Sequence, residues 1–436
     1  MRITILLFTI LFTTFLSAQH WEVTEMAAMP ERVSNNAVCE GFINGEAYVY
    51  SFAGIDSTKI YSGIHLKAYR YSVTDNQWEI IESLPDDMGK IAASASRVGD
   101  IIYIIGGYHV FANNSEVSSE KVHRYDMVNN TYLSDGAPIP VAIDDQTQAV
   151  WRDSLIYVIT GWSNFGNVPD VQIYNPSMDE WMEGTATPNN HDYKSFGSSG
   201  TIIGDTIYYF GGAQSTGNFP IQNDFRIGII NPDNPIEIEW SVQQFGTDVN
   251  AYRPAATQSK GKAFWLGGSS ITYNYNGIAY NGSGGVPPSN RSLFYEPETG
   301  NWEENFSTAL PMDLRSMAEI NDSIKFIVGG MLEDQWVSNK TWMLDSNVEP
   351  VIVGLEEINT LNFSIYPNPT SDYIYFNFLT SNNPETINYS LTDVHGKLVM
   401  EGAVANGERL DISSLSDGVY ALKIRNSAAA GFIVKL

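Results

Sequence analysis

The chain has little cysteine, few basic residues and, beyond residue 16, no long apolar run. Of its 436 residues only Cys39 is a cysteine, so a disulfide scaffold and a thiolate zinc site are both excluded. The 24 basic residues face 50 acidic ones, which gives a formal net charge of −26. That balance argues against binding to nucleic-acid phosphates or to an anionic membrane surface. Charged residues make up only 17%, whereas glycine and aromatic residues are plentiful, which favours short strands and tight turns.

Most signatures of enzymes and metal sites are also missing. No His-Glu-x-x-His, phosphate-binding P-loop, Gly-x-Ser-x-Gly or EF-hand sequence occurs, and the six histidines show no metal-ligand spacing. We therefore predict no metal and no cofactor. Whether the protein is an enzyme stays open at this point, with a non-enzymatic role favoured.

The first 18 residues are predicted to be a signal peptide. Arg2 precedes a 14-residue apolar run from Ile3 to Leu16, and the small residues Ser17 and Ala18 follow. The run is shorter than the ~20 residues that cross a bilayer as a helix, and no later stretch is long enough. We expect cleavage after Ala18, an exported mature protein and no membrane span in it.

One pattern recurs six times along the next 330 residues. A short apolar run ends in a small residue followed by glycine, and the glycines stand at positions 54, 107, 161, 212, 268 and 330. In phase with it, a tyrosine precedes a tryptophan by seven residues, as in Tyr71 and Trp78 or Tyr174 and Trp181. Each unit is predicted to contain four strands, the second of them apolar throughout and therefore buried on both faces.

The glycine pairs at this spacing resemble the kelch repeat, over about residues 21–348. The resemblance implies an all-β fold, a six-bladed kelch-type β-propeller at residues 19–348. The sixth copy lacks a tryptophan-led fourth strand, and the segment Trp21–Met26 offers a spare one. We expect this N-terminal strand to complete the last blade, because closing the ring removes exposed sheet edges.

A separate module follows Val348. Residues 349–362 are interpreted as a linker, and residues 363–436 predict a small Ig-like β-sandwich of about seven strands. Three of its ordered motifs are Tyr366-Pro367-Asn368-Pro369, Asp393-Val394-His395-Gly396-Lys397 and Gly418-Val419-Tyr420. Together they resemble the C-terminal sorting domain of type IX secretion cargo in the Bacteroidota. The resemblance implies recognition by the type IX translocon and a protein that is released or attached to the outer-membrane surface.

Basic residues mark the predicted ligand site. In kelch propellers, as the resemblance implies, the segment before each blade's first strand borders the mouth of the central channel. In this chain those segments carry Arg32, Lys90, Lys194, Arg253 and Arg315. A ring of cations in so acidic a protein would attract an anionic ligand, and sialic-acid mutarotases and acidic-peptide-binding kelch domains use such a ring. The alternative is that these cations form ion pairs between blades, the common fate of such side chains.

Three functions remain open. The first, which we favour, is a non-enzymatic module that binds an unknown glycan or protein ligand. The second is an enzyme on an acidic sugar, similar to a sialic-acid mutarotase, and the third is a structural surface adhesin. No residue is assigned as catalytic, although His191, Asp144 and Asp192 are the candidate general acids or bases. The aromatic residues of the loops are candidates for stacking on sugars: Trp162, Phe165, Phe219, Tyr273, Tyr275 and Tyr280, three of them in the long segment Ser269–Asn290.

Overall fold

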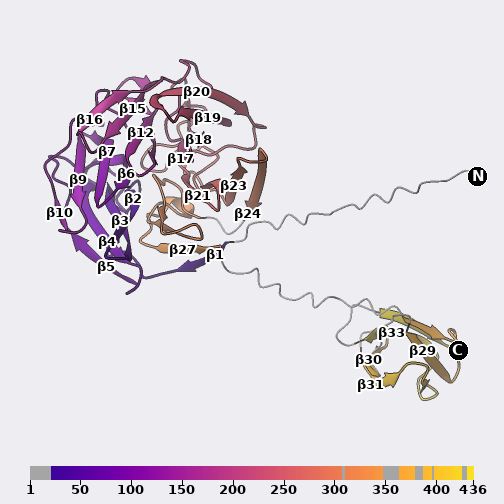
Figure 1. Ribbon diagram of the computed structural model, residues 1–436. Coiled ribbons are helices and arrows are strands. Elements are labelled where there is room, and N and C mark those ends of the chain that lie inside the picture. Colours follow the sequence, from indigo (N-terminus) through magenta and orange to yellow (C-terminus); the bar gives the residue numbers. More distant parts are fainter. Residues whose placement is uncertain (1–20, 307–309, 347–362, 379–385, 395–396, 425–429) are drawn as a thin grey trace, which may run out of the picture. The chain divides into compact units, whose positions relative to one another are not determined.

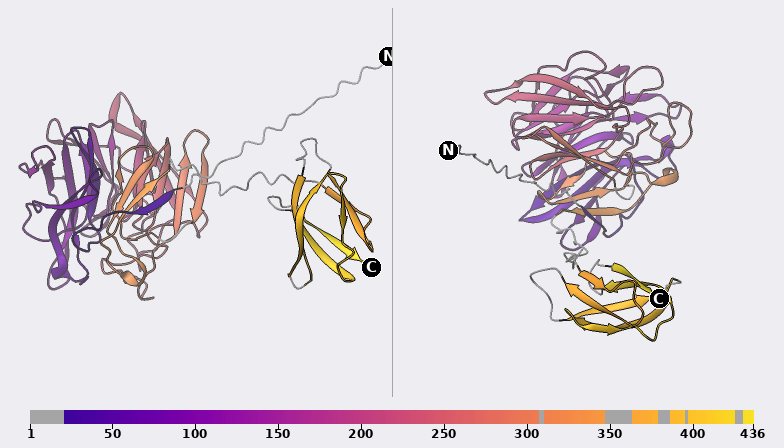
Figure 2. Two further views of the ribbon diagram at one scale, coloured as in Figure 1. Left: turned by 90° about the horizontal axis from the view of Figure 1, so that it is seen from below. Right: turned by 90° about the vertical axis from the view of Figure 1, so that its right-hand side faces the viewer.

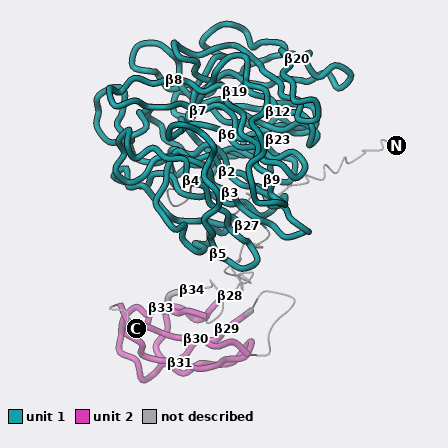
Figure 3. Tube along the Cα trace, turned by 90° about the vertical axis from the view of Figure 1, so that its left-hand side faces the viewer, with its two compact units in different colours: residues 1–348 teal, residues 349–436 magenta. Residues whose placement is uncertain are grey.

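The computed structural model describes residues 21–306, 310–346, 363–378, 386–394, 397–424 and 430–436 (Figure 1). The chain divides into two compact units, Met1–Val348 and Glu349–Leu436 (Figure 3). The predicted signal peptide and the predicted linker, residues 349–362, lie outside the described residues.

The first unit is a ring of six antiparallel sheets, five with four strands and one with an additional short strand, which confirms the predicted six-bladed propeller (Figure 1). Blade 1 contains β2 (Ala37–Ile43), β3 (Glu46–Ile55), β4 (Ile64–Ser72) and β5 (Gln77–Ile81). Blade 2 contains β6 (Ile91–Val98), β7 (Ile101–Val110), β9 (Val122–Asp126) and β10 (Thr131–Tyr132), with β8 (Glu116–Ser118) paired to β7. Blade 3 contains β11 (Thr147–Trp151), β12 (Leu155–Ile159), β15 (Val171–Asn175) and β16 (Glu180–Glu183), beside the hairpin of β13 (Trp162–Ser163) and β14 (Gly166–Asn167).

The remaining blades repeat this order. Blade 4 contains β17 (Ser199–Ile203), β18 (Thr206–Phe210), β19 (Asp224–Asn231) and β20 (Asn234–Gln244). Blade 5 contains β21 (Ala255–Ser259), β22 (Lys262–Leu266), β23 (Arg291–Glu296) and β24 (Asn301–Phe306). Blade 6 contains β25 (Ala318–Glu319), β26 (Ile324–Val328), β27 (Thr341–Asp345) and β1 (Glu22–Glu25). Two short 3-10 turns, η1 (Tyr61–Gly63) and η2 (Glu333–Gln335), lie in loops.

The N-terminal strand closes the ring, as predicted. β1 pairs antiparallel with β27, with Val23 opposite Leu344 and Thr24 opposite Met343. Just before β1, the ring of Trp21 stacks on Phe264 of blade 5 at a centroid distance of 5.2 Å. The propeller therefore joins its first and last strands within one sheet, and β27 has no open edge.

The glycine pairs occur where one blade meets the segment that leads into the next. Gly106 has φ +69°, and a Cβ at this position would overlap the carbonyl oxygen of Ile143. A residue without a side chain is therefore needed at this approach. Blades 1 and 3 use Ala53 and Thr160 instead, and both adopt the same left-handed conformation, with φ 55° and 48°.

Three of the repeated tryptophans, Trp78, Trp181 and Trp240, hold their blades to the leading segments. The indole N–H of Trp78 donates to the carbonyl oxygen of Ala27 (3.1 Å), and that of Trp181 donates to Ala137 (2.8 Å). Each acceptor belongs to the segment that enters the same blade. Their role in the structure is blade packing combined with one hydrogen bond.

The second unit is a sandwich of two antiparallel sheets (Figure 2). One sheet orders β28 (Phe363–Tyr366), β29 (Tyr373–Phe378) and β32 (Arg409–Asp411); the other orders β31 (Leu398–Ala405), β30 (Thr386–Thr392), β33 (Gly418–Ile424) and β34 (Ala430–Lys435). Its core includes Ile374, Phe376, Leu391, Leu422 and Ile433. These seven strands in the described part of the tail confirm the predicted sandwich. Across both units, no helix among the described residues has the length and apolar character needed to cross a bilayer.

Candidate functional site

Each blade is entered through one residue in the left-handed backbone region, here called its lead-in residue. The six lead-in residues are Asn35, Ala92, Asp145, Gly197, Arg253 and Asp313, with φ between 51° and 68°. Backbone hydrogen bonds join neighbours: the N–H of Gly197 donates to Asp145 (2.8 Å), and the N–H of Arg253 donates to Gly197 (2.7 Å). The lead-in residues therefore stand side by side at the start of the innermost strands, around the mouth of the channel.

A buried ion-pair cluster, here called the plug, is formed by the side chains of four lead-in residues and of Arg315. The four are Asn35, Asp145, Arg253 and Asp313. Arg253 donates from Nε and Nη2 to the two carboxylate oxygens of Asp145 (3.0 and 2.6 Å) and from Nη1 to Asp313 (3.0 Å). Arg315 also pairs with Asp145, and the amide of Asn35 donates to Asp313 (3.1 Å). Burial opposes ionisation of Asp145, but the charges of Arg253 and Arg315 outweigh it and lower its pKa. The formal charges of two arginines and two aspartates cancel.

The five predicted cations do not gather around one axis. Arg253 and Arg315 meet in the plug, whereas Lys90 is buried elsewhere, with Nζ 2.7 Å from Asp86. Arg32 lies with its guanidinium 4.1 Å above the ring centroid of Trp336. The expected ring of free cations thus differs from the observed placement, because three of these four cations pair with carboxylates and Arg32 packs on an aromatic ring.

The remaining cation and two of the acid–base candidates lie in blade 4's leading segment. Lys194 is half-buried, and its carbonyl oxygen accepts from Gln222 (3.2 Å). His191 is exposed. Asp192 accepts a hydrogen bond at its carbonyl oxygen from Nε of Arg226 (2.7 Å). None of the three lines the cavity described next. Of the acid–base candidates Asp144 lines it, and of the five predicted cations Arg253 does. Any binding role of the five cations stays a prediction.

A cavity of about 150 Å³ opens beside the plug. Blades 2 to 5 contribute its walls through their loops, far apart in the sequence. The lining residues are Tyr108, Glu116, Asp144, Asp145, Trp162, Phe196, Phe219, Arg253, Asn274 and Tyr280. We call this cavity the mouth pocket.

Aromatic rings form one wall of the mouth pocket. Trp162, Phe196 and Phe219 pack edge to face, with centroid distances of 5.4, 5.7 and 5.6 Å among the three. Tyr280 contacts Phe219 at 4.6 Å. Mutual packing of this kind holds each ring in one orientation, so the wall is preformed.

Carboxyl groups form the polar part of the mouth pocket. Asp144 is 4% exposed, and the hydroxyl of Ser118 donates to it (2.6 Å). Burial, followed by the charge of neighbouring Asp145, raises the pKa of Asp144 well above its usual value. Glu116 is exposed at the start of β8. The site therefore combines one carboxyl group poised to hold a proton with one open to solvent.

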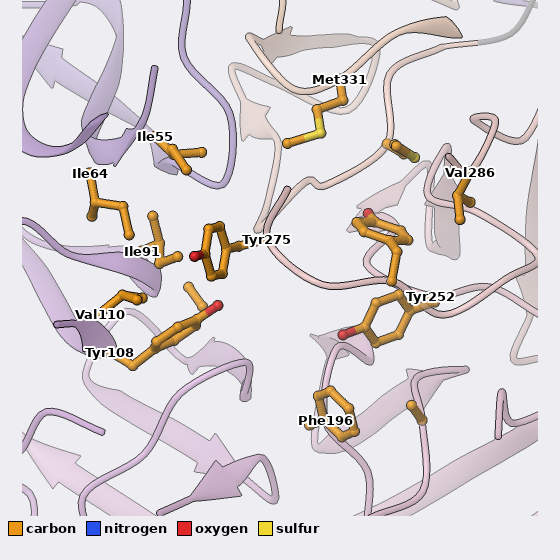
Figure 4. Close-up of a cluster of buried hydrophobic side chains, with 14 of the residues drawn as sticks. Ile55, Ile64, Ile91, Tyr108, Val110, Phe196, Tyr252, Tyr275, Val286 and Met331 are labelled. Carbon is orange, nitrogen blue, oxygen red and sulfur yellow. The ribbon is translucent and has the colours of Figure 1, made fainter. Parts of the chain in front are cut away.

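An apolar layer lies beneath the pocket and includes two of its lining residues, Tyr108 and Phe196, which approach from different blades (Figure 4). The long segment Ser269–Asn290 is part of this layer: Tyr273 and Tyr275, two of the predicted sugar-stacking aromatics, are buried in it. The hydroxyl of Thr272 further donates to the carbonyl oxygen of Phe219 (2.7 Å). The segment therefore supports the pocket wall.

Among the lining residues, sequence reasoning named Asp144, Trp162, Phe219, Arg253 and Tyr280 but missed Tyr108, Glu116, Phe196 and Asn274. Tyr108 directly follows a glycine pair, which is a usable signal. Glu116 lies in an irregular hairpin with no repeat position, and nothing in the sequence marks it.

A second cavity, of about 370 Å³, follows the channel itself and is lined by later residues of all six innermost strands, including Cys39, Gln148 and Thr257. Within the described residues, no group of three or more His, Cys, Asp or Glu side chains is placed to hold a metal ion.

Comparison with known proteins agrees with both units. Residues 364–435 match the family described as secretion system C-terminal sorting domain. The chain is 28% identical over 157 residues to Kelch-like protein terF of Aspergillus terreus, covering 34% of this chain and 32% of that protein. It is 31% identical over 127 residues to Kelch-like protein 36 of Bos taurus, covering 27% of this chain and 19% of that protein. The chain thus spans between about a fifth and a third of these relatives.

A solved structure titled "Structure of YjhT" resembles the chain with a TM-score of 0.57, at 14% identity, over 72% of this chain and 95% of that one. At this identity the likeness concerns the fold alone. The sorting domain marks the protein for secretion or attachment at the cell surface and implies interaction with the secretion system.

Proposed function

From a chain that joins a kelch-type propeller to a secretion system C-terminal sorting domain, we propose an exported protein that binds a glycan or protein side chain in the mouth pocket, without catalysis. The sorting domain would direct export through the type IX translocon. The propeller would then present its pocket outside the cell.

The preformed aromatic wall beside hydrogen-bonding groups carries this proposal. Concave sites that combine apolar walls with a few polar groups are typical of ligand binding. At about 150 Å³ the mouth pocket has room for one ring or one side chain. Trp162 and Phe219 offer stacking surface, and Asn274 and Glu116 offer hydrogen bonds at the rim.

The acidic-sugar alternative has less support. An acidic sugar needs a cation to hold it, and the arginine that lines the mouth pocket already binds Asp145 and Asp313. A purely structural adhesin is supported by the same ion pairs, which link leading segments of different blades. Asp144 supplies a candidate proton donor if the pocket does catalyse a reaction.

The test is ligand binding by the mature full-length chain on glycan and peptide arrays, followed by calorimetry. Tyr280→Ala removes part of the aromatic wall. Phe306→Ala is the matched control, because Phe306 is an exposed aromatic on the outer strand β24. Saturable binding that Tyr280→Ala weakens and Phe306→Ala preserves would support the proposal. Binding unaffected by Tyr280→Ala, or absent from both arrays, would overturn it.

A further inference from the structure

We propose that the mouth pocket selects a ligand group carrying an alkylammonium cation, such as an amino sugar or a lysine side chain. The inference rests on the proposed function, since it names the chemistry of the ligand that the same pocket binds. The sequence predicted an anionic ligand, whereas this inference gives the ligand a positive charge.

The first argument is the charge left over in the pocket. Its one lining cation, Arg253, is 1% exposed and is bound by Asp145 and Asp313. Among the described residues, no ion pair is formed by the side chains of Glu116 or Asp144. An ammonium group entering the pocket would meet these two carboxyl groups without a competing free cation.

The second argument is the aromatic wall. The faces of aromatic rings attract cations, and the attraction grows where water is excluded. Trp162 supplies the ring type that binds cations best. The protein already uses this interaction next to the pocket: the guanidinium of Arg253 lies 5.1 Å from the ring of Tyr252 and 5.5 Å from that of Tyr273.

The third argument concerns what an anion would meet. A carboxylate in the pocket would lie against the carboxylate of Glu116, and the guanidinium of Arg253 could turn to it only by leaving Asp145. Breaking a buried, bidentate ion pair is costly. The geometry therefore disfavours anions and leaves neutral and cationic groups.

The experiment is calorimetric titration of the mature full-length chain with matched probes at low and moderate salt. Glucosamine is compared with glucose and glucuronate, and N-acetyl-lysine amide with N-acetyl-norleucine amide. We expect the ammonium probes to bind about tenfold or more tightly than their neutral partners, as a cation–π contact plus a carboxylate would give. The sugar and amino-acid pairs distinguish the two sources of the cation.

Two variants locate the effect. Glu116→Gln should remove most of the preference for ammonium probes, whereas Glu120→Gln, an exposed acid of the same blade that does not line the pocket, should not. Equal binding of charged and neutral probes, or tighter binding of glucuronate, would overturn the cation inference and leave the proposed function standing. Absence of binding by every probe would overturn this inference and count against the proposed function as well.

Discussion

Arg253 and Asp145 form a bidentate ion pair across the mouth of the channel, with N–O distances of 3.0 and 2.6 Å. The two residues lead into blades 5 and 3, so the pair reaches past the lead-in residue of blade 4. That residue is Gly197, and a Cβ there would overlap the ring of Tyr252. A Cβ at this position would also lie 3.2 Å from Cγ of Arg253, so the glycine leaves room for the arginine side chain beside it.

Breaking this pair should destabilise the propeller strongly. Arg253→Met leaves Asp145 and Asp313 buried with fewer partners, at an expected cost of about 3–5 kcal/mol in the free energy of unfolding. Chemical denaturation followed by tryptophan fluorescence measures it. Lys340→Met, which breaks an exposed pair with Glu25, should cost no more than about 1 kcal/mol. Equal effects of the two changes would contradict the structural role of the plug.

Crowding at Gly197 can be separated from backbone strain. Gly197→Ala introduces a Cβ at φ +68° against Tyr252, whereas Gly204→Ala introduces one at φ +58° with no atom within 4 Å. Both changes carry similar backbone strain, and only the first adds a clash. We expect Gly197→Ala to cost about 1–3 kcal/mol more than Gly204→Ala in thermal or chemical unfolding. Matching losses of stability would show that the lead-in site is not crowded.

Binding of an ammonium ligand should release a proton from Asp144. The groups that face this carboxyl are Asp145, Glu116, Arg253 and the Ser118 hydroxyl, and burial raises its pKa in the free protein. A bound cation lowers that pKa, so affinity should increase as pH rises through it. Calorimetry in buffers of different ionisation enthalpy measures the released proton. Asp144→Asn should abolish the release, and a release that persists in this variant would assign the proton to another group.

His65 should contribute to loss of stability in mild acid. Neither ring nitrogen has a hydrogen-bond partner, and burial lowers its pKa to about 4. The unfolded chain, with a pKa near 6.5, binds the proton first, so stability present above pH ~6.5 falls as pH decreases toward about 4. His65→Gln should flatten this part of the curve relative to the parent protein. Parallel stability curves between pH 7 and 4 would contradict the assignment.

The blades could be predicted because their determinants are local and periodic. A small residue followed by glycine, as at Gly106 and Gly107, recurs once per blade where that blade crowds the segment leading into the next. Its six copies predict six blades, and Trp78, Trp181 and Trp240 add a hydrogen bond to the leading segment in three of them. The missing fourth strand of the last copy likewise predicts closure by Trp21–Met26.

The amino-acid sequence by itself therefore determined the propeller, its closure and the sorting domain, but not the charge of the candidate site. The leading segments carry aspartates and arginines at equivalent places, and their order does not say which side chains will meet. Arg253 finds Asp145 from 108 positions away, and Glu116 reaches the pocket from an irregular hairpin. Only the tertiary structure determines these contacts, because a buried charged side chain pairs with the group of opposite charge that the assembled ring places next to it.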